Sequence, residues 1–319
     1  MKAIRIHDDG GPEVLRYEEA PDPVAGTGEV LIELRAASLN HLDLWVRMGL
    51  PSVPKPRILG ADGAGIRADT GERVVINPGL EQGTRITVVG EHMDGTHAEL
   101  IAVPETNVYA IPDSLSFEDA AAFPLVFETA WRMLVTKAGL QPDEWVLIWG
   151  IGGGVATAAL AIVKALGARA VVTSSSDEKL AQAVELGADA TVNHAQGDVA
   201  SRIKEATGGG ADVVIETVGA DTWTTSLSVA RPAARICVCG ATSGPNPPAN
   251  LHRIWWKQLT IHGSTMGARA DFEAVLDLVV SGRARPIIDS VFPLSETRAA
   301  HERLESGEQL GKVVLTIPD

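Results

Sequence analysis

Residues 146–168 read VLIWGIGGGVATAALAIVKALGA, and this stretch contains the pattern that decides the fold. An apolar run ends at Gly150, a cluster of glycines follows, and apolar residues at helical spacing begin at once. A glycine turn between a strand and a helix brings backbone N–H groups close to a pyrophosphate, because no Cβ stands in the way. The pattern predicts a dinucleotide-binding loop, with a ligand-free turn as the alternative. The expected binding residues are Gly150, Gly152, Gly153, Gly154 and Val155.

Strand and helix patterns alternate from this loop towards the C-terminus. Six apolar runs read as strands: residues 146–150, 168–173, 190–193, 211–217, 234–240 and 259–265. Between them the apolar spacing predicts helices over residues 153–166, 177–186, 197–206 and 221–229. Such alternation is typical of a doubly wound parallel sheet, so we expect an α/β fold with a six-stranded sheet.

The segment before the glycine loop has a different character. Short apolar runs such as MKAIRI and EVLIELRAAS alternate with turns that contain Gly or Pro, and one short helix is expected near residues 39–48. Ser116 and Asp119 have the spacing of a capping box, and a helix is expected over residues 126–138. The tail ends in GKVVLTIP, which is apolar enough to pair with the first lobe. We therefore expect a β-rich domain of residues 1–118 and 267–319, with the doubly wound domain of residues 119–266 inserted between its two parts.

Charge and composition argue against several classes of partner. Lysine and arginine total 27 against 41 acidic residues, and the formal charge of −14 predicts no nucleic-acid partner. No run of about 18 apolar residues is present and MKAIRIHDDG does not have the pattern of a secretory signal, so no membrane association is expected. Cys237 and Cys239 read as buried strand residues, with a metal or redox pair as the alternative. They fit a reducing, cytoplasmic location.

The end of the second predicted strand bears on the choice of cofactor. NAD sites place an acid there, whose charge would repel a 2′-phosphate. Here Ser174 and Ser175 follow the strand and Lys179 lies one turn further on, which suits a phosphate. Asp177 reads as the N-cap of the next helix, and His194 follows the third strand. The sequence therefore predicts NADP(H) as the cofactor, with solvated Lys179 and His194 side chains as the alternative.

Many stretches of the chain together resemble one family. They include NHLDLWVRMG, ILGADGAG, GERVVINPG, AAFPLVFETAWRML, the glycine loop, ADVVIETVG, CGATSG, HGSTMG and GKVVL. Over nearly its whole length the chain resembles the medium-chain dehydrogenase/reductase superfamily, and most closely its quinone oxidoreductase and zinc-type alcohol dehydrogenase-like branch. The resemblance implies a GroES-like catalytic domain, a Rossmann domain and a cofactor cleft.

The zinc positions of the family are changed in this sequence. Zinc alcohol dehydrogenases of the superfamily hold a catalytic zinc through Cys, His and a second Cys, and the matching positions are Asn40, Ala61 and Leu125. Two of these side chains have no donor atom. The acid that follows the His is Asp62, and the hydroxyl of the proton relay is replaced by Leu42. The four-cysteine structural zinc lobe is missing too, so we expect no metal.

The resemblance implies hydride transfer from NADPH to a quinone or an α,β-unsaturated carbonyl, which needs less activation than oxidation of an alcohol. Asn40 would donate a hydrogen bond to the developing oxyanion, Asp43 would orient Asn40, and Thr129 would lie near the nicotinamide. Asn40 also reads as a helix N-cap. The further cofactor residues that the resemblance and the strand ends imply are Val218, Gly240, Ala241, Ser264, Thr265, Met266 and Lys312.

Two other functions and one assembly are compatible with these residues. The chain could be an alcohol dehydrogenase-like enzyme, or a catalytically weak NADPH-binding sensor with a phosphate loop and no metal. Trp255 and Trp256 precede the sixth strand, which in the family often pairs across a homodimer, so a homodimer is expected. Ordinary core packing of the two tryptophans is the alternative.

Overall fold

The computed structural model describes residues 1–83 and 85–318. The chain forms two compact units: unit 1 is Met1–Leu125 with Ala268–Asp319, and unit 2 is Val126–Gly267. The first boundary lies after Leu125 rather than after residue 118, because helix α2 (Phe117–Ala122) packs on strands of unit 1. Its alanines at 120, 121 and 122 are fully buried there.

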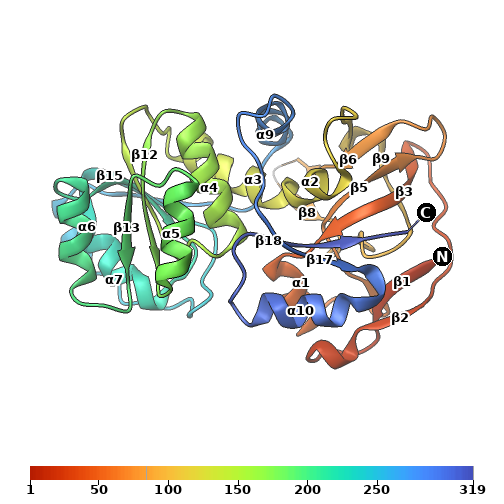
Figure 1. Cartoon of the computed structure of the whole chain (residues 1–319). Coiled ribbons are helices and arrows are strands. Elements are labelled where there is room, and N and C mark those ends of the chain that lie inside the picture. The colour runs from red at the N-terminus through yellow and green to blue at the C-terminus, as the bar shows by residue number, and fades with distance from the viewer. Residues whose placement is uncertain (84, 319) are drawn as a thin grey trace. The chain divides into compact units, whose positions relative to one another are not determined.

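Unit 2 contains a doubly wound parallel sheet with the strand order β13-β12-β11-β14-β15-β16. Strands β12, β13 and β15 of this sheet are labelled in Figure 1. Its strands are β11 (Trp145–Ile148), β12 (Arg169–Ser174), β13 (Ala190–Asn193), β14 (Ala211–Glu216), β15 (Ala230–Val238) and β16 (Thr260–Gly263). Its helices include α4 (Gly154–Ala165), α5 (Asp177–Glu185), α6 (Val199–Thr207), α7 (Ala220–Val229) and α8 (Leu251–Trp256). This confirms the predicted six-stranded α/β domain. The order reverses between β11 and β14, so the carboxyl ends of these strands border the crevice in which such sheets bind ligands.

The central strands of unit 2 are buried on both faces. Val146, Leu147 and Ile148 of β11 have no exposed surface, because helices cover both sides of a parallel sheet. Apolar runs of this kind predict strands well, which explains the close agreement with the expected ranges. The helix expected over residues 126–138 differs: α3 (Pro124–Trp131) is followed by a π-helical turn over Arg132–Lys137.

Unit 1 is a β-rich lobe built from both ends of the chain. Its main sheet has the order β10-β6-β5-β3-β18-β17, with β9 also paired to β3. The strands are β3 (Glu29–Ser38), β5 (Asp62–Arg67), β6 (Arg73–Ile76), β9 (Leu100–Pro104), β10 (Val108–Ala110), β17 (Ile288–Pro293) and β18 (Lys312–Thr316). The C-terminal strand β18 lies between β3 and β17 (Figure 1), so the predicted return of the tail onto the first lobe is observed.

The rest of unit 1 completes this lobe. Its other strands are β1 (Lys2–Ile6), β2 (Arg16–Glu19), β4 (Arg57–Ile58), β7 (Gly79–Gln82) and β8 (Arg85–Val88). Its other helices are α1 (His41–Arg47), α9 (Arg269–Val280) and α10 (Thr297–Glu305). Ser116 Oγ accepts the Asp119 N–H at 3.0 Å, as the capping-box spacing predicts. In the part of the chain that the structure describes, every helix is too short or too polar to cross a bilayer.

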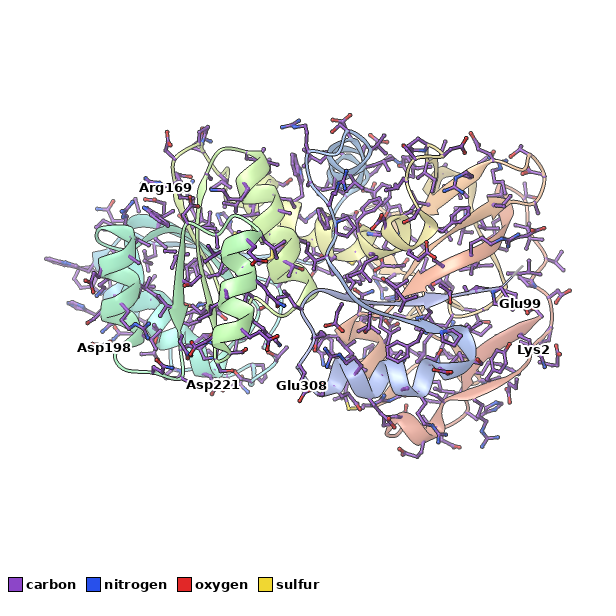
Figure 2. The ribbon with its side chains drawn as sticks, in the orientation of Figure 1. Lys2, Glu99, Arg169, Asp198, Asp221 and Glu308 are labelled. Carbon is purple, nitrogen blue, oxygen red and sulfur yellow. The ribbon has the colours of Figure 1, made fainter. Side chains whose placement is uncertain are left out.

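Charged side chains gather at the surface of each unit. In Figure 2 the labelled residues Lys2 and Glu99 lie at the edge of unit 1, where the Lys2 N–H donates to Glu99 Oε2 at 2.7 Å. Arg169 and Asp198 lie at the periphery of unit 2 in the same view. Only a few charged side chains are buried among the described residues, and some of these form the candidate site.

Candidate functional site

A buried ion pair forms the centre of the candidate site in unit 1. Asp62 begins β5 and Lys312 begins β18, and their side chains are 0% and 3% exposed. Lys312 Nζ lies 3.0 Å from Asp62 Oδ2 and donates to Asn40 Oδ1 at 2.6 Å. Asp62 Oδ1 also accepts the Leu125 N–H at 2.9 Å. Because β3 lies between β5 and β18, three segments far apart in sequence bring these charges together.

Asn40 stands at the N-terminus of α1 with its amide turned into the ion pair. Its Nδ2 donates to Asp62 Oδ2 at 2.9 Å, and its Oδ1 accepts from Lys312. Asn40 is therefore at the N-cap position, as predicted, but its side chain bonds the ion pair. The N–H of Asn40 is bonded by Asp43 Oδ2 at 2.7 Å. Asp43 thus holds the backbone that carries the Asn40 amide.

Asp43 is buried, and none of the ion pairs among residues 1–83 and 85–318 includes it. Its second oxygen accepts the Gly60 N–H at 2.9 Å, so the carboxyl joins α1 to the loop before β5. Burial raises the pKa of Asp43 to about 7, while the backbone hydrogen bonds act in the opposite direction. This carboxyl therefore changes charge near neutral pH, two residues beyond the His41 that follows Asn40.

The three positions that match the family's zinc ligands do not offer a zinc donor set. The Asn40 amide is bonded to Asp62 and Lys312, Ala61 is fully buried, and Leu125 contributes its backbone N–H to Asp62. Within residues 1–83 and 85–318, no group of three or more His, Cys, Asp or Glu side chains could hold a metal ion. The positive charge of this cluster is the Lys312 ammonium.

The glycine loop of unit 2 fits a nucleotide diphosphate. Helix α4 begins at Gly154, and its N-cap, Gly153, supplies no side-chain cap. The first-turn N–H groups of a helix have no acceptor within the helix, so they are available to an anion. A Cβ built on Gly153 would meet only Gly150 O, at 3.8 Å, and one built on Gly150 would meet nothing within 4 Å. The backbone here is therefore open to a ligand.

The end of β12 lies beside this loop in the sheet. Ser174 ends the strand and its Oγ accepts the Ser176 N–H at 3.1 Å, whereas Ser175 is exposed. Ser176 is the N-cap of α5, because its Oγ accepts the Lys179 N–H at 3.3 Å. The prediction that Asp177 caps this helix is wrong, since Asp177 is the first helical residue. The Ser176 hydroxyl, one residue earlier, accepts the Lys179 backbone N–H instead.

Asp177 and His194 have partners of their own. Asp177 Oδ1 accepts Asn193 Nδ2 at 2.7 Å, which ties the start of α5 to the end of β13. His194 is exposed, and its Nδ1 lies 3.3 Å from Thr173 Oγ1. Partial burial lowers the pKa of His194. Ser175 follows the end of β12, His194 follows the end of β13, and Lys179 lies in the first turn of α5.

The other predicted cofactor positions of unit 2 follow β14, β15 and β16: Val218, Gly240, Ala241, Ser264, Thr265 and Met266. The Ser264 N–H donates to Val238 O at 2.9 Å. Its hydroxyl is buried and makes no hydrogen bond within the described residues. Met266 has a left-handed backbone, φ +48°, which is uncommon outside glycine. Thr129 lies in α3 and is buried.

Sequence reasoning missed the partners that organise these residues. From the sequence, Asp62 stands out only as the remnant of a zinc site, and neither Glu216 nor His97 stands out at all. An acid inside an apolar strand, as in ILGADGAG or ADVVIET, is a usable signal, because buried carboxylates need partners. For His97 no such signal exists in the sequence.

His97 and His301 form a second buried group in unit 1. Their rings meet edge to face with centroids 6.3 Å apart, and Arg47 Nη1 lies 3.0 Å from His301 Nδ1. Among the described residues, Nε2 of His301 and both ring nitrogens of His97 make no hydrogen bond. Burial lowers the pKa of His97 to about 3 and that of His301 well below its ordinary value. Both rings are therefore neutral at pH 7.

We expect acid to destabilise the protein through these histidines. Between about pH 6.5 and about pH 3, His97 binds a proton in the unfolded chain but not in the native protein. The free energy of unfolding therefore decreases by about 1.4 kcal/mol for each unit by which the pH is lowered. Asp43, whose pKa is raised, adds a slope of the same size and the opposite sign between about pH 4 and its folded pKa, so in that range it offsets one of the two histidines. His97→Leu should flatten the melting temperature profile between about pH 6.5 and about pH 4.5. His252→Leu is the control, because His252 is exposed, and it should leave this profile unchanged. An unchanged slope in His97→Leu would refute the assignment of the acid sensitivity to His97.

Comparison with known proteins gives matches over both units. Two family models match: "Alcohol dehydrogenase GroES-like domain" over residues 26–113 and "Zinc-binding dehydrogenase" over residues 154–281. A quinone oxidoreductase of Pseudomonas aeruginosa is 34% identical over 325 residues, covering 98% of this chain and 99% of that protein. The crystal structure of an NAD-dependent alcohol dehydrogenase is 39% identical, with a TM-score of 0.95 and 100% of both chains covered.

A further solved structure contains ligands. The 2-octenoyl-CoA carboxylase reductase CinF, in complex with NADP and 2-octenoyl-CoA, is 27% identical with a TM-score of 0.93, and the match covers 99% of this chain and 87% of that chain. Each of these similarities agrees with the two-unit fold and with the glycine loop. The chain therefore belongs to the medium-chain dehydrogenase/reductase superfamily, in the branch of the quinone oxidoreductases and alcohol dehydrogenase-like proteins, and is an oxidoreductase whose fold binds a nicotinamide cofactor.

Proposed function

We propose that the protein reduces quinones or α,β-unsaturated carbonyl compounds with NADPH and without zinc. When bound, the reduced nicotinamide supplies a hydride to the acceptor, and the acceptor oxygen then gains negative charge. The protein must stabilise that charge with hydrogen-bond donors. The changed zinc positions leave this task to amide and ammonium groups.

The observation that carries this proposal is the arrangement of the Asn40 amide. Its oxygen is held by Lys312 at 2.6 Å and one of its two Nδ2 protons by Asp62. The second proton has no acceptor among residues 1–83 and 85–318, so it is available to a substrate oxygen. Because the ammonium withdraws electron density through the amide oxygen, the remaining N–H is a stronger donor than that of a free carboxamide. An electron-poor acceptor needs no stronger catalyst than such an oriented donor.

Two lines of evidence support the choice of acceptor and cofactor. A quinone oxidoreductase and a reductase bound to NADP and an enoyl-CoA are among the relatives, and both names describe electron-poor acceptors. Ser174 and Ser175 stand at the end of β12, where an acid would favour NAD, and Lys179 lies one turn further on in α5, which favours a phosphate. One similar structure is that of an NAD-dependent alcohol dehydrogenase. NADH must therefore be tested beside NADPH, and alcohols beside quinones and enones.

The first experiment uses the purified, chelator-treated chain. We expect NADPH to bind at least about tenfold more tightly than NADH in fluorescence titrations, because a cation at a 2′-phosphate contributes about 1.5–3 kcal/mol. Lys179→Ala should remove most of that preference, and Lys204→Ala, on another helix of unit 2, should not. Steady-state rates with simple quinones and enones should not rise when zinc is added.

Each outcome of this experiment has a definite meaning. Preference for NADH would refute the phosphate site at Lys179. Turnover of alcohols that depends on added zinc would favour the alcohol dehydrogenase-like function. Tight NADPH binding without turnover of any acceptor would favour a sensor.

We also propose that the chain forms a homodimer through β16. This strand is at one end of the order β13-β12-β11-β14-β15-β16, and Ile261 on it is 39% exposed. Trp255 and Trp256, on the helix just before it, are 60% and 68% exposed. An edge strand beside exposed aromatic side chains is a surface that proteins normally cover. A second copy of β16 would extend the sheet and cover both.

Light scattering after size-exclusion chromatography tests the dimer. We expect the mass of two 33.6-kDa chains for the wild type. Ile261→Lys should weaken the dimer at least about tenfold, because it places a charge on the pairing strand. Val184→Lys, an exposed position on α5, is the matched control. A monomeric wild type at micromolar concentration would refute the proposal.

A further inference from the structure

Glu216, at the end of β14, is a buried carboxylate whose side-chain partners among the described residues are two backbone N–H groups and two hydroxyls. Its side chain is inaccessible to solvent. Oε1 accepts the N–H groups of Val218 and Gly219, each at 3.0 Å, and the hydroxyl of Thr222 at 2.7 Å. Oε2 accepts the hydroxyl of Ser226 at 2.6 Å.

The positions of the protons in this network establish the charge. Trp149 Nε1 can only donate, and it donates to Ser226 Oγ at 2.8 Å. The single hydroxyl proton of Ser226 is therefore directed to Glu216. Oε1 already accepts two backbone N–H groups, which only donate. Thr222 Oγ1 lies 2.7 Å from Oε1 but 3.4 Å from its other acceptor, Gly219 O, so its proton is also directed to the carboxylate, and the network favours a charged Glu216. Across the described parts of the chain, no ion pair to Glu216 is formed, so its charge is stabilised by dipoles alone.

The network lies at the edge of the sheet where the nicotinamide half of a dinucleotide binds. In a doubly wound sheet the first half, here β11 to β13, takes the adenosine part, and the second half takes the other nucleotide. Residues 217–219 follow β14, and Ser243 N donates to Val218 O at 2.8 Å. A Cβ on Gly219, whose φ is +94°, would lie 2.5 Å from Gly244 O. The loops after β14 and β15 are thus closely packed against each other beside the Glu216 carboxylate.

We propose that Glu216 makes the protein bind the oxidised cofactor in preference to the reduced one. The inference rests on the proposed function, because it requires a nicotinamide cofactor. The oxidised ring carries a positive charge that the reduced ring lacks, and the two forms are otherwise nearly equal in shape. A buried anion without a counter-ion attracts the first form and not the second. Selection of the oxidised ring favours the loss of hydride from the bound reduced cofactor, which is the direction that a reductase uses.

Equilibrium titration of the full-length protein with NADP⁺ and with NADPH tests this. Glu216→Gln keeps the size of the side chain and removes its charge. We expect the Kd for NADP⁺ to rise on the order of tenfold more than the Kd for NADPH, which is the effect of one charge across a partly screened protein medium. Glu185→Gln, an exposed carboxylate on α5, should leave the ratio unchanged.

A purely structural role of Glu216 predicts a different result. It would weaken both nucleotides by the same factor, and that outcome overturns the proposal. Thr222→Val provides a second test, because it removes one donor and keeps the charge, so the ratio of the two Kd values should stay within about twofold of the wild-type ratio. A shift there as large as in Glu216→Gln would also overturn it. If neither nucleotide binds the wild type, the proposed function itself fails, and this is seen before any variant is measured.

Discussion

Gly153→Val should lower the affinity for NADPH by at least about 100-fold while the melting temperature stays within about 2 °C of the wild type. The position is favourable for such a separation of binding from folding. Gly153 has φ −76° and ψ 151°, an extended conformation that valine accepts readily. The nearest atom to an added Cβ is Gly150 O at 3.8 Å, which is ordinary van der Waals distance, so the chain has room where the new side chain begins.

The substitution is expected to weaken ligand binding rather than folding. The isopropyl group would stand over the N-terminus of α4, where the first-turn N–H groups would bond the pyrophosphate. Each lost hydrogen bond to a charged group costs about 1.5–3 kcal/mol, so loss of one or two accounts for the expected effect. Gly150→Val would be less informative, because Gly150 has φ +62° and any side chain there strains the backbone.

Ala161→Val is the matched control for this prediction. It places the same valine side chain on the same helix, two turns away from its N-terminus. NADPH titration of both variants, with melting curves for each, separates the local effect from a general one. Unchanged NADPH affinity in Gly153→Val would show that the phosphates bind elsewhere.

The strands of unit 2 could be predicted from the sequence because each is a short apolar run, buried on both faces. The expected range 211–217, for example, differs from β14 (Ala211–Glu216) by one residue. Helix ends were harder. Ser176 and Asp177 are both good N-caps, and only the position of the Ser176 hydroxyl on the Lys179 N–H decides between them. The π-helical turn after Trp131 depends on packing that no local pattern contains.

The candidate site was predicted residue by residue but not as an arrangement. The resemblance pointed to Asn40, Asp43 and Lys312 separately. That Lys312 bonds Asp62 follows from the pairing of β18 with β3 and of β3 with β5, which joins positions 250 residues apart in the sequence. Such pairing is a tertiary property. That Lys312 binds the cofactor stays a prediction, and its side-chain hydrogen bonds within unit 1 are those with Asn40 and Asp62.

Lys312→Met should destabilise the protein by about 3–5 kcal/mol, measured as the free energy of unfolding in urea. The substitution keeps most of the aliphatic side chain and removes the ammonium. Asp62 would then remain fully buried with hydrogen bonds from Asn40 and Leu125 but without a cation. A buried charge that has lost its partner accounts for the size of the effect. Lys2→Met is the control, because its pair with Glu19 is exposed and contributes at most about 1 kcal/mol.

A double substitution distinguishes loss of charge from loss of packing. In Lys312→Met with Asp62→Asn, the uncompensated charge is gone while the packing change remains. We therefore expect the double variant to be more stable than Lys312→Met alone, by at least about 1 kcal/mol. If the double variant is instead less stable, the cost in Lys312→Met comes from packing. The ion pair would then not be what holds the Asn40 amide, and the hydrogen-bond donor proposed for the substrate oxygen would lose its support.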